Sequence, residues 1–398
     1  MNDAWKQCIS ILNDNHYDAY LVGGATRNFL LHLPVQDFDI TTNATPTQIK
    51  KCFRNYRMLD IGIKHGTITI FINNTPYEIT TYRIDMDYRD HRHPSKVVFS
   101  NQLKDDCMRR DFTMNAICYH PEQGYFDFFN GISDIENKII RCIGNPNERF
   151  NEDALRILRA IRFSCQLQFT IEPITKKALL ENKVLLKHIS NERIQDELNK
   201  IFLSSSCAQK LFEYHDVLEV IIPECREISL SPKRLNKTYE MLSKCKPSIA
   251  LRLSCLLHQL HEPALTSLTI CKRLKYSNVL TKRVQVLLSV MNKPISSKFE
   301  FKLLLSQYSD FFEDILYFKC LIDTTLDENE LFKQYQTIIQ ENECISLPQL
   351  DLKGNELLDL GYPKNQISTL LHECLYQVMQ DKVPNKKMEL ITFLKTNK

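Results

Sequence analysis

The spacing of apolar residues changes along the chain, from short runs near the start to helical repeats later. In the first 130 residues several runs alternate with polar residues at every second position, as half-buried strands do. Beyond residue 175 apolar residues recur at three- and four-residue spacing almost to the end, which is typical of amphipathic helices. The pattern predicts a region of strands and helices followed by a long helical region.

The clearest strand pattern lies on either side of Asn73 and Asn74. Residues 66–72 and 77–83 alternate and are rich in β-branched side chains, and an Asn-Asn pair is a turn signal. These two segments are predicted to form a β-hairpin.

A short apolar run at 18–22 leads into Gly23 and Gly24, and Arg27 follows three residues later. A glycine pair lets backbone N–H groups come close to a phosphate, and an arginine adds a fixed positive charge. This segment indicates a phosphate-binding turn.

Two carboxylates, Asp37 and Asp39, follow in a predicted strand at 35–40, where they share one face. Two close carboxylates repel each other unless a cation lies between them, and hard oxygen ligands with open positions suit Mg²⁺. With the glycine turn, the pair predicts a metal-held nucleoside triphosphate; the alternative is a solvated acidic strand. Glu78, in the hairpin, is either a third carboxylate of this site or a solvent-facing residue.

Residues 83–94 break the apolar pattern, because charges of both signs alternate there with tyrosine and histidine. We expect an exposed, mobile loop that moves against a polar substrate, with a solvated hairpin tip as the alternative. Its charged residues of interest are Arg83, Asp85, Arg89, Asp90 and Arg92.

Two adjacent arginines, Arg109 and Arg110, precede Asp111 in a segment of helical character. A phosphate contact oriented by a carboxylate is the functional interpretation. The alternative is a surface salt bridge, which contributes little to stability.

A helix is predicted to begin at Asn151 as its N-cap. Asp153 and Arg156, three residues apart, are expected to contact each other and to offer acceptors and donors in one plane, as reading a base edge requires. Arg159 lies on the same face, whereas Arg162 lies nearer the apolar stripe, where its charge must snorkel or meet a buried partner. Surface pairing at three-residue spacing is the alternative.

The 398 residues are enough for two or more domains, and the net charge of +3 is too small to identify a polyanionic partner. The fourteen cysteines form no Cys-x-x-Cys pair and lie in apolar contexts, which favours a reducing, cytoplasmic environment over disulfides or zinc. We expect no signal peptide and no membrane-spanning segment.

The order of these segments resembles the class II tRNA nucleotidyltransferase (CCA-adding enzyme) and bacterial poly(A) polymerase family. The resemblance is dense from residue 20 to about 202 and rests on Gly23-Gly24-x-x-Arg27, Asp37-x-Asp39, Arg109-Arg110-Asp111-Phe112-Thr113, Glu152-Asp153-x-x-Arg156-x-x-Arg159-x-x-Arg162-Phe163 and Glu192-Arg193-Ile194-x-x-Glu197-Leu198.

The resemblance implies an α+β fold in which a polymerase-β-like head with a short mixed sheet is followed by all-helical domains. The expected division is a nucleotidyltransferase head at 1–140, a neck for base recognition at 141–205, a body at 206–330 and a tRNA-binding tail at 331–398.

The resemblance also implies an activity: addition of C, C and A to the 3′ end of tRNA from CTP and ATP, without a nucleic-acid template and with release of pyrophosphate. Asp37 and Asp39 would bind two Mg²⁺ ions. Gly24, Arg27, Arg110 and Asp111 would serve the nucleotide, and Asp153 and Arg156 would pair with its base while Arg159 and Arg162 hold that helix. The partner would be the 3′ end and acceptor arm of tRNA, and residues 83–94 would correspond to the flexible loop linked to switching from C to A addition.

Several functions remain open at this stage. Within the same chemistry they are a poly(A) polymerase and a CC-only or A-only adding enzyme; from another class, a catalytically silent RNA-binding protein. One departure from the family is Asn28, which stands where an aspartate usually follows the arginine and is expected to loosen the orientation of Arg27.

Overall fold

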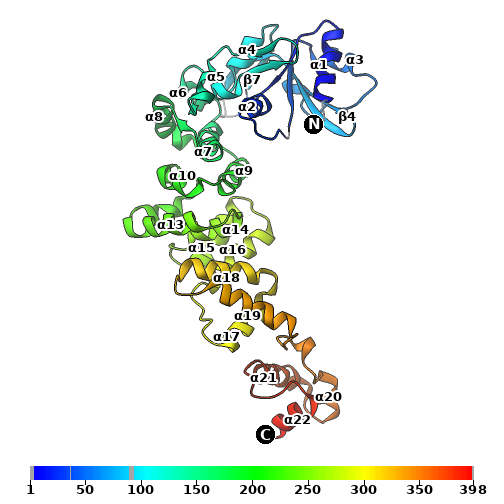
Figure 1. The fold of residues 1–398 in the computed structure, drawn as a ribbon, viewed down its shortest axis with the longest axis vertical. Helices are drawn as coiled ribbons and strands as arrows, with labels where there is room; N and C mark the ends of the chain where they lie inside the picture. The colour runs from blue at the N-terminus through cyan, green and yellow to red at the C-terminus, as the bar shows by residue number, and fades with distance from the viewer. Residues whose placement is uncertain (1–3, 36, 89–93, 397–398) are drawn as a thin grey trace. The chain divides into compact units, whose positions relative to one another are not determined.

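The computed structural model describes residues 4–35, 37–88 and 94–396, and the chain divides into two compact units. The first unit comprises 1–239 with 273–275, and the second comprises 240–272 with 276–398. Within the described residues every strand belongs to the first unit, and the later part of the chain is helical (Figure 1). The α+β class that the family resemblance implies is confirmed, and so is the helical later part that the apolar pattern predicts.

The first unit is built on a seven-stranded sheet with the order β3-β4-β5-β2-β1-β8-β9. The β2–β5 pair is parallel and the other neighbours are antiparallel, so the sheet is mixed, as expected. Its strands are β1 (Ala19–Val22), β2 (Asp39–Thr42), β3 (Arg57–Leu59), β4 (Thr67–Ile72), β5 (Thr75–Thr81), β8 (Cys118–His120) and β9 (Gly124–Phe126).

The predicted hairpin is confirmed as β4 and β5, which pair antiparallel around Asn73 and Asn74. Both asparagines have positive φ, at 51° and 62°. A two-residue turn with left-handed backbone matches the twist of the flanking strands, and asparagine tolerates that conformation.

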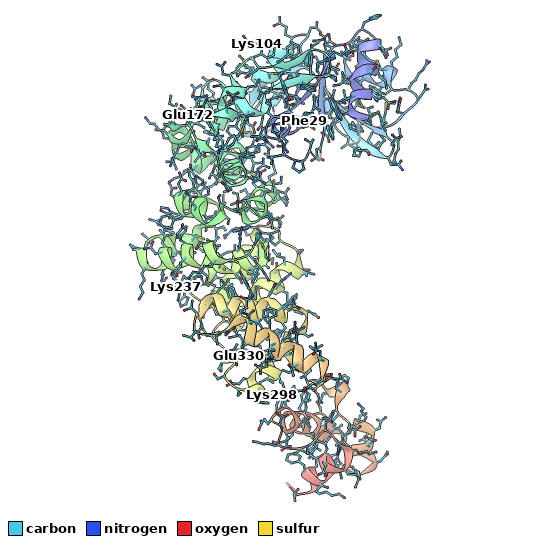
Figure 2. All side chains as sticks on the ribbon, in the orientation of Figure 1. Phe29, Lys104, Glu172, Lys237, Lys298 and Glu330 are labelled. Carbon is cyan, nitrogen blue, oxygen red and sulfur yellow. The ribbon has the colours of Figure 1, made fainter. Side chains whose placement is uncertain are left out.

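Apolar side chains from α1 (Ala4–Asp14) and α2 (Gly24–Leu30) form part of the core beside the sheet. The ring of Trp5 stacks on Phe38 with centroids 5.9 Å apart. Phe29, labelled in Figure 2, lies 5.8 Å from Trp5 between ring centroids. This packing anchors the segment that connects α2 to β2, and so the carboxylates at its end.

Two predicted boundaries near the glycine turn need correction. The strand expected at 35–40 begins only at Asp39, because the backbone ladder with β1 and β5 starts there, although Val35 and Phe38 still pack on the core. Asp37 therefore precedes the strand rather than lying in it.

The expectation of a loop over residues 83–94 is also wrong in part. β6 (Arg83–Tyr88) and β7 (Pro94–Phe99) form a separate antiparallel two-stranded sheet. A two-stranded ribbon is held by backbone hydrogen bonds between its strands, so it can form without an apolar repeat. Arg89, Asp90 and Arg92 lie outside the described residues.

The remaining elements of the first unit are mainly short helices. They are α3 (Pro46–Cys52), α4 (Leu103–Met108), α5 (Gly131–Glu136), β10 (Ile139–Ile140), α6 (Pro146–Glu152), α7 (Leu155–Leu167), β11 (Thr170–Ile171), α8 (Pro173–Asn182), α9 (Asn191–Phe202), α10 (Cys207–Glu213), α11 (His215–Ile221), α12 (Arg226–Ser229) and α13 (Pro232–Lys244).

The helix predicted to begin at Asn151 is instead two helices. α6 ends at Glu152, Asp153 has an extended backbone with φ −140° and ψ 101°, and α7 begins at Leu155. Asn151 is thus in the last turn of α6 and caps nothing. The break turns Asp153 out of any helix, which changes its neighbours.

The second unit consists of helices over the described residues. Its tail-end core is an apolar cluster centred on Leu350, Leu357, Cys374 and Leu390. Within the described part of the chain, no helix is long and apolar enough to cross a membrane. The helices are α14 (Ile249–Leu257), α15 (Pro263–Arg273), α16 (Asn278–Val290), α17 (Lys298–Tyr308), α18 (Phe312–Ile322), α19 (Glu328–Gln340), α20 (Gly354–Asp359), α21 (Ile367–Met379) and α22 (Lys387–Thr396).

Candidate active site

The site starts at the turn between β1 and α2. Gly23 has φ 77° and ψ −136°, a conformation that side-chain-bearing residues rarely adopt. A Cβ atom at this position would lie 3.4 Å from Oδ2 of Asp39 and 3.5 Å from Nη1 of Arg110. The bare backbone of Gly23 therefore brings a carboxylate and a guanidinium close to the start of α2.

The strand register places the carboxylates. Val22 is the partner of Asp39 across β1 and β2, and Asp39 is in turn the partner of Glu78 across β2 and β5. Desolvation raises the pKa of Asp39, and Asp37 adds to this effect while Arg110 opposes it. Desolvation also raises the pKa of Glu78, reinforced by Asp39 and then Asp37. Burial is thus the main cause that disfavours the ionised form of both carboxylates.

These carboxylates do not all gather at one point. Glu78 is not among the residues that line the site cavity, whereas Asp37 and Asp39 are. Within the described residues, no three His, Cys, Asp or Glu side chains form a group able to hold a metal ion by themselves. The two aspartates are oxygen donors with open positions, a donor set that fits a hard divalent cation whose remaining ligands come from water or substrate.

The buried carboxylate of Asp106, on α4, fixes the two adjacent arginines. Arg109 donates from Nε and Nη2 to Oδ1 of Asp106 at 2.9 and 2.7 Å, and Arg110 donates from Nη2 to Oδ2 at 3.1 Å. Burial acts to raise the pKa of Asp106, but the charges of the two arginines hold it below its usual value. The arginines form buried ion pairs here, so the interpretation as surface salt bridges is wrong.

Asp111 occupies the centre of a second network. It accepts hydrogen bonds from Nδ2 of Asn115 at 3.0 Å and from Nε of Arg159 at 2.8 Å. Asn115, in the 3₁₀ turn Thr113–Asn115, accepts in turn from Nη1 of Arg27 at 2.7 Å. Arg27 of α2 and Arg159 of α7 are therefore connected through two side chains of one turn.

Asp153 and Arg156, which were expected to pair through their side chains, meet only through the backbone, where the N–H of Arg156 donates to the carbonyl oxygen of Asp153 at 3.0 Å. Asp153 pairs with Arg193 of α9, whose Nη2 lies 2.8 Å from Oδ2. Arg156 donates from Nη1 to Glu152 at 2.6 Å and from Nη2 to the carbonyl oxygen of Arg109 at 2.8 Å. The expected pairing of Asp153 with Arg156 is corrected: each side chain is held by a different partner.

Arg162 was expected either to extend its charge to solvent or to pair with a buried partner, and it pairs with a buried partner. Its Nε lies 2.7 Å from Oε2 of Glu197, a residue of α9 with 3% of its surface exposed. The Arg162 guanidinium also lies over the ring of Phe163, with its Cζ atom 4.1 Å from the centroid. The Cζ atoms of Arg27 and Arg159 lie 4.9 and 5.5 Å from the same centroid, so three guanidinium groups surround one aromatic ring.

A single cavity of about 740 Å³ joins these groups, a size typical of small-molecule sites. It contains most of the predicted site residues and leaves out Glu78, Arg83 and Asp85. The predicted residues that line it are Gly24, Arg27, Asp37, Asp39, Arg110, Asp111, Asp153, Arg156, Arg159 and Arg162.

Sequence reasoning gave no role to several other lining residues, among them Asn115, Gln166 and Lys200. Asn115 follows Asp111 by four residues, which was the available sequence signal for a contact between them. Gln166 and Lys200 reach the cavity because α7 packs against α9. The spacing of residues along the sequence does not specify how two helices pack.

Three family models match consecutive parts of the chain. "Poly A polymerase head domain" matches residues 19–141, "Probable RNA and SrmB- binding site of polymerase A" matches 168–228, and domain 2 of tRNA nucleotidyltransferase matches 249–394. The first match contains the glycine turn and the aspartate pair.

Curated relatives carry one name, "CCA-adding enzyme". The relative from Staphylococcus saprophyticus is 32% identical over 406 residues, covering 98% of this chain and 97% of its own. The relative from Pediococcus pentosaceus is 47% identical over 194 residues, about half of each chain.

Solved structures share the fold over the full length. The Bacillus stearothermophilus CCA-adding enzyme in complex with CTP has a TM-score of 0.81 and 26% identity, and the alignment covers 99% of this chain and 97% of that one. The Thermotoga maritima CCA-adding enzyme complexed with tRNA has a TM-score of 0.73 at 20% identity, covering 100% and 95%, and shows likeness of fold.

Proposed function

Because the chain belongs to the CCA-adding enzyme family, we propose that it adds C, C and A to the 3′ end of tRNA from CTP and ATP. The observation that carries this proposal is one cavity lined both by Asp37 and Asp39 and by the arginines of α7. The first pair suits phosphoryl transfer, and the second set suits recognition of a nucleotide.

The family implies use of a divalent metal, and we propose Mg²⁺ at Asp37 and Asp39. Two carboxylates that line this cavity fit a small hard cation that keeps water and substrate oxygens among its ligands. When bound, such ions activate the attacking 3′-hydroxyl and stabilise the charge on the leaving pyrophosphate. Glu78 lies beside Asp39 in the strand register and is proposed to support its position.

The triphosphate is proposed to bind along the glycine turn. The backbone of Gly24 and the guanidinium groups of Arg27 and Arg110 provide N–H donors and positive charge on that side of the cavity. Asp111 positions Arg159 directly and Arg27 through Asn115. The arginines held in this way bind the phosphates and orient them for in-line attack.

The base edge is proposed to be read by Asp153 and Arg156, with Arg159 and Arg162 holding α7. A carboxylate accepts from the exocyclic amine of cytosine or adenine, whereas uracil and guanine present a carbonyl oxygen at the corresponding position. Selection of CTP and ATP by protein side chains follows from that difference.

The ribbon of β6 and β7 is proposed to take part in the change from C to A addition. Asp85, in β6, lies 3.8 Å from Nη1 of Arg109 and 3.0 Å from Nε of Arg83. The carbonyl oxygen of Arg109 accepts a hydrogen bond from Arg156. A movement of the ribbon that shifts Arg109 would therefore also shift Arg156, the side chain proposed to read the base.

We propose four functional regions: a catalytic head at 1–140, a neck at 141–205, a body at 206–330 and a tail at 331–398 that binds tRNA. The matches to a polymerase head and to an RNA-binding region support the first two assignments. A cytoplasmic location is also proposed, since all fourteen cysteines lie in the described residues and none forms a disulfide.

The decisive experiment offers purified protein three tRNA transcripts, ending before, within and after the CCA sequence. Each transcript is incubated with Mg²⁺ and CTP, ATP or both, and product lengths are read on a sequencing gel. Stepwise addition of two C residues and one A supports the proposal. Long A tails would indicate a poly(A) polymerase, extension by C alone or A alone a partial enzyme, and no extension with intact tRNA binding a silent RNA-binding protein.

A further inference from the structure

Arg27 differs from the other arginines of the cavity in the partners that hold it. Each of the other six forms an ion pair with a carboxylate. Across the described residues, no carboxylate forms an ion pair with Arg27; its guanidinium donates to the amide oxygens of Asn28 and Asn115. The six pairs are Arg109 and Arg110 with Asp106, Arg156 with Glu152, Arg159 with Asp111, Arg162 with Glu197 and Arg193 with Asp153.

The side-chain amide of Asn28 forms a clamp, by which we mean that its oxygen holds the guanidinium of Arg27 while its nitrogen is fixed to Pro34. Its Oδ1 accepts from Nε of Arg27 at 3.2 Å and from Nη2 at 2.8 Å, which fixes the plane of the guanidinium. Its Nδ2 donates to the carbonyl oxygen of Pro34 at 2.9 Å. A carbonyl oxygen can only accept a hydrogen bond, and in the Asn28 amide only the nitrogen can donate one. The nitrogen must therefore face Pro34, which leaves the oxygen of Asn28 facing Arg27.

The expectation that Asn28 would loosen Arg27 is therefore wrong. Asparagine keeps the acceptor that an aspartate would provide and adds a donor for the Pro34 carbonyl, which an ionised aspartate lacks. What the asparagine omits is the negative charge. Burial, together with the positive charges of Arg162 and Arg159, lowers the pKa of Arg27 to about 10, while the charge of Asp111 partly opposes this; the value is still well above neutral pH.

We propose that Asn28 is a positioning residue that orients Arg27 without neutralising it, and so reserves its charge for the triphosphate of the incoming nucleotide. The identity of that ligand rests on the proposed function. Phe163 serves the same end, because its ring packs against the Arg27 guanidinium and carries no charge. The cavity thus holds one guanidinium that is oriented in advance and that forms no ion pair with a carboxylate of the described residues.

The test uses Asn28→Asp, which keeps the shape and the acceptor but adds a negative charge. Isothermal titration of the full chain with inorganic tripolyphosphate, CTP and cytidine separates phosphate binding from base binding. We expect the affinity for tripolyphosphate and CTP to fall about tenfold at low salt, with cytidine unchanged, because a charge a few ångströms from the phosphates acts through a partly desolvated site. The loss should shrink as salt is raised, because mobile ions screen it.

The matched control is Asn15→Asp. Asn15 is exposed at the end of α1, and its Nδ2 donates to the carbonyl of Ile11 at 2.8 Å, so the same substitution removes an equivalent donor outside the cavity. It should leave tripolyphosphate binding unchanged. Asn28→Ala removes the clamp without adding charge, and its loss of affinity should depend little on salt.

Unchanged tripolyphosphate binding by Asn28→Asp at low salt would overturn the proposal, and so would a loss that is equal for cytidine. The outcome is separable from that of the proposed function. A chain that extends tRNA while Asn28→Asp binds normally refutes only the role of Asn28. If tripolyphosphate binding depends on Asn28 as expected but the chain extends no tRNA, only the proposed activity is refuted.

Discussion

Arg193 holds Asp153 by two parallel hydrogen bonds, from Nη2 to Oδ2 at 2.8 Å and from Nη1 to Oδ1 at 3.2 Å. The two residues are 40 positions apart and both line the cavity. Asp153 has an extended backbone, and its Oδ1 also accepts from the backbone N–H of Leu155 at 3.1 Å, at the start of α7. The fork of Arg193 therefore sets the plane of the carboxylate proposed to read the base.

Replacing Arg193 should blur nucleotide selection. In Arg193→Met the Asp153 carboxylate loses its fork, and we expect the preference for CTP over UTP, measured as the ratio of kcat/KM values, to fall about tenfold. Arg193→Lys should recover part of the preference, since one charged donor remains. Lys177→Met, a substitution in an exposed pair on α8, is the control and should leave selection intact. Equal selectivity in the Met variant and wild type would refute the positioning role.

The aspartate pair should be essential for chemistry and dispensable for RNA binding. Asp39→Asn removes one of the two carboxylate donors at the cavity, and we expect nucleotide incorporation to fall at least about 100-fold. Filter binding of tRNA should change little, because the tRNA contacts are proposed elsewhere. Asp60→Asn, at an exposed surface pair, provides the control. Near-normal turnover by Asp39→Asn would contradict the metal assignment.

Asp111 should contribute to stability in a pH-dependent way. Burial favours its neutral form, but Arg159, the hydrogen bond from Asn115 and Arg156 together hold the pKa of Asp111 well below its usual value. A lowered pKa in the folded state means that the ionised carboxylate stabilises the protein above about pH 4, its unfolded value, and that this contribution is lost as the pH falls.

We expect Asp111→Asn to lower the free energy of unfolding by about 2 kcal/mol at pH 7, because Arg159 loses its carboxylate partner. The difference from wild type should shrink steadily below pH 4. Urea denaturation followed by fluorescence is suited to this, since Trp5 is the single tryptophan and lies in the core of the first unit. A difference that stays constant down to pH 2 would show that ionisation of Asp111 is unimportant.

Shortening the ribbon should affect A addition more than C addition. Replacing residues 83–94 by a short turn removes Asp85, which lies 3.8 Å from Arg109 and two contacts from Arg156. Single-nucleotide extension of transcripts ending before the first C and before the final A gives the two rates separately. Asp85→Asn tests the contact without deleting the ribbon. Equal loss of both additions would argue against a role in switching.

Local patterns were sufficient to predict much of the fold. The Asn73-Asn74 hairpin and the helical region beyond residue 175 appear in the structure where the sequence indicated them. Both depend on neighbours in the chain: a turn that tolerates positive φ, and an apolar stripe at helical spacing. The site residues could be named because glycine, aspartate and arginine in that order have few other chemical uses.

Packing decided what those residues contact. The break at Asp153, the pairing of Arg162 with Glu197 and the link from Arg27 to Asn115 join segments tens of residues apart, and no periodicity encodes such partners. The sequence by itself determined that a carboxylate pair, a glycine turn and an arginine series are present. Only the tertiary structure decided which arginine of the cavity has no carboxylate ion-pair partner among the described residues, because that depends on which oxygens the fold brings within hydrogen-bond distance of each guanidinium.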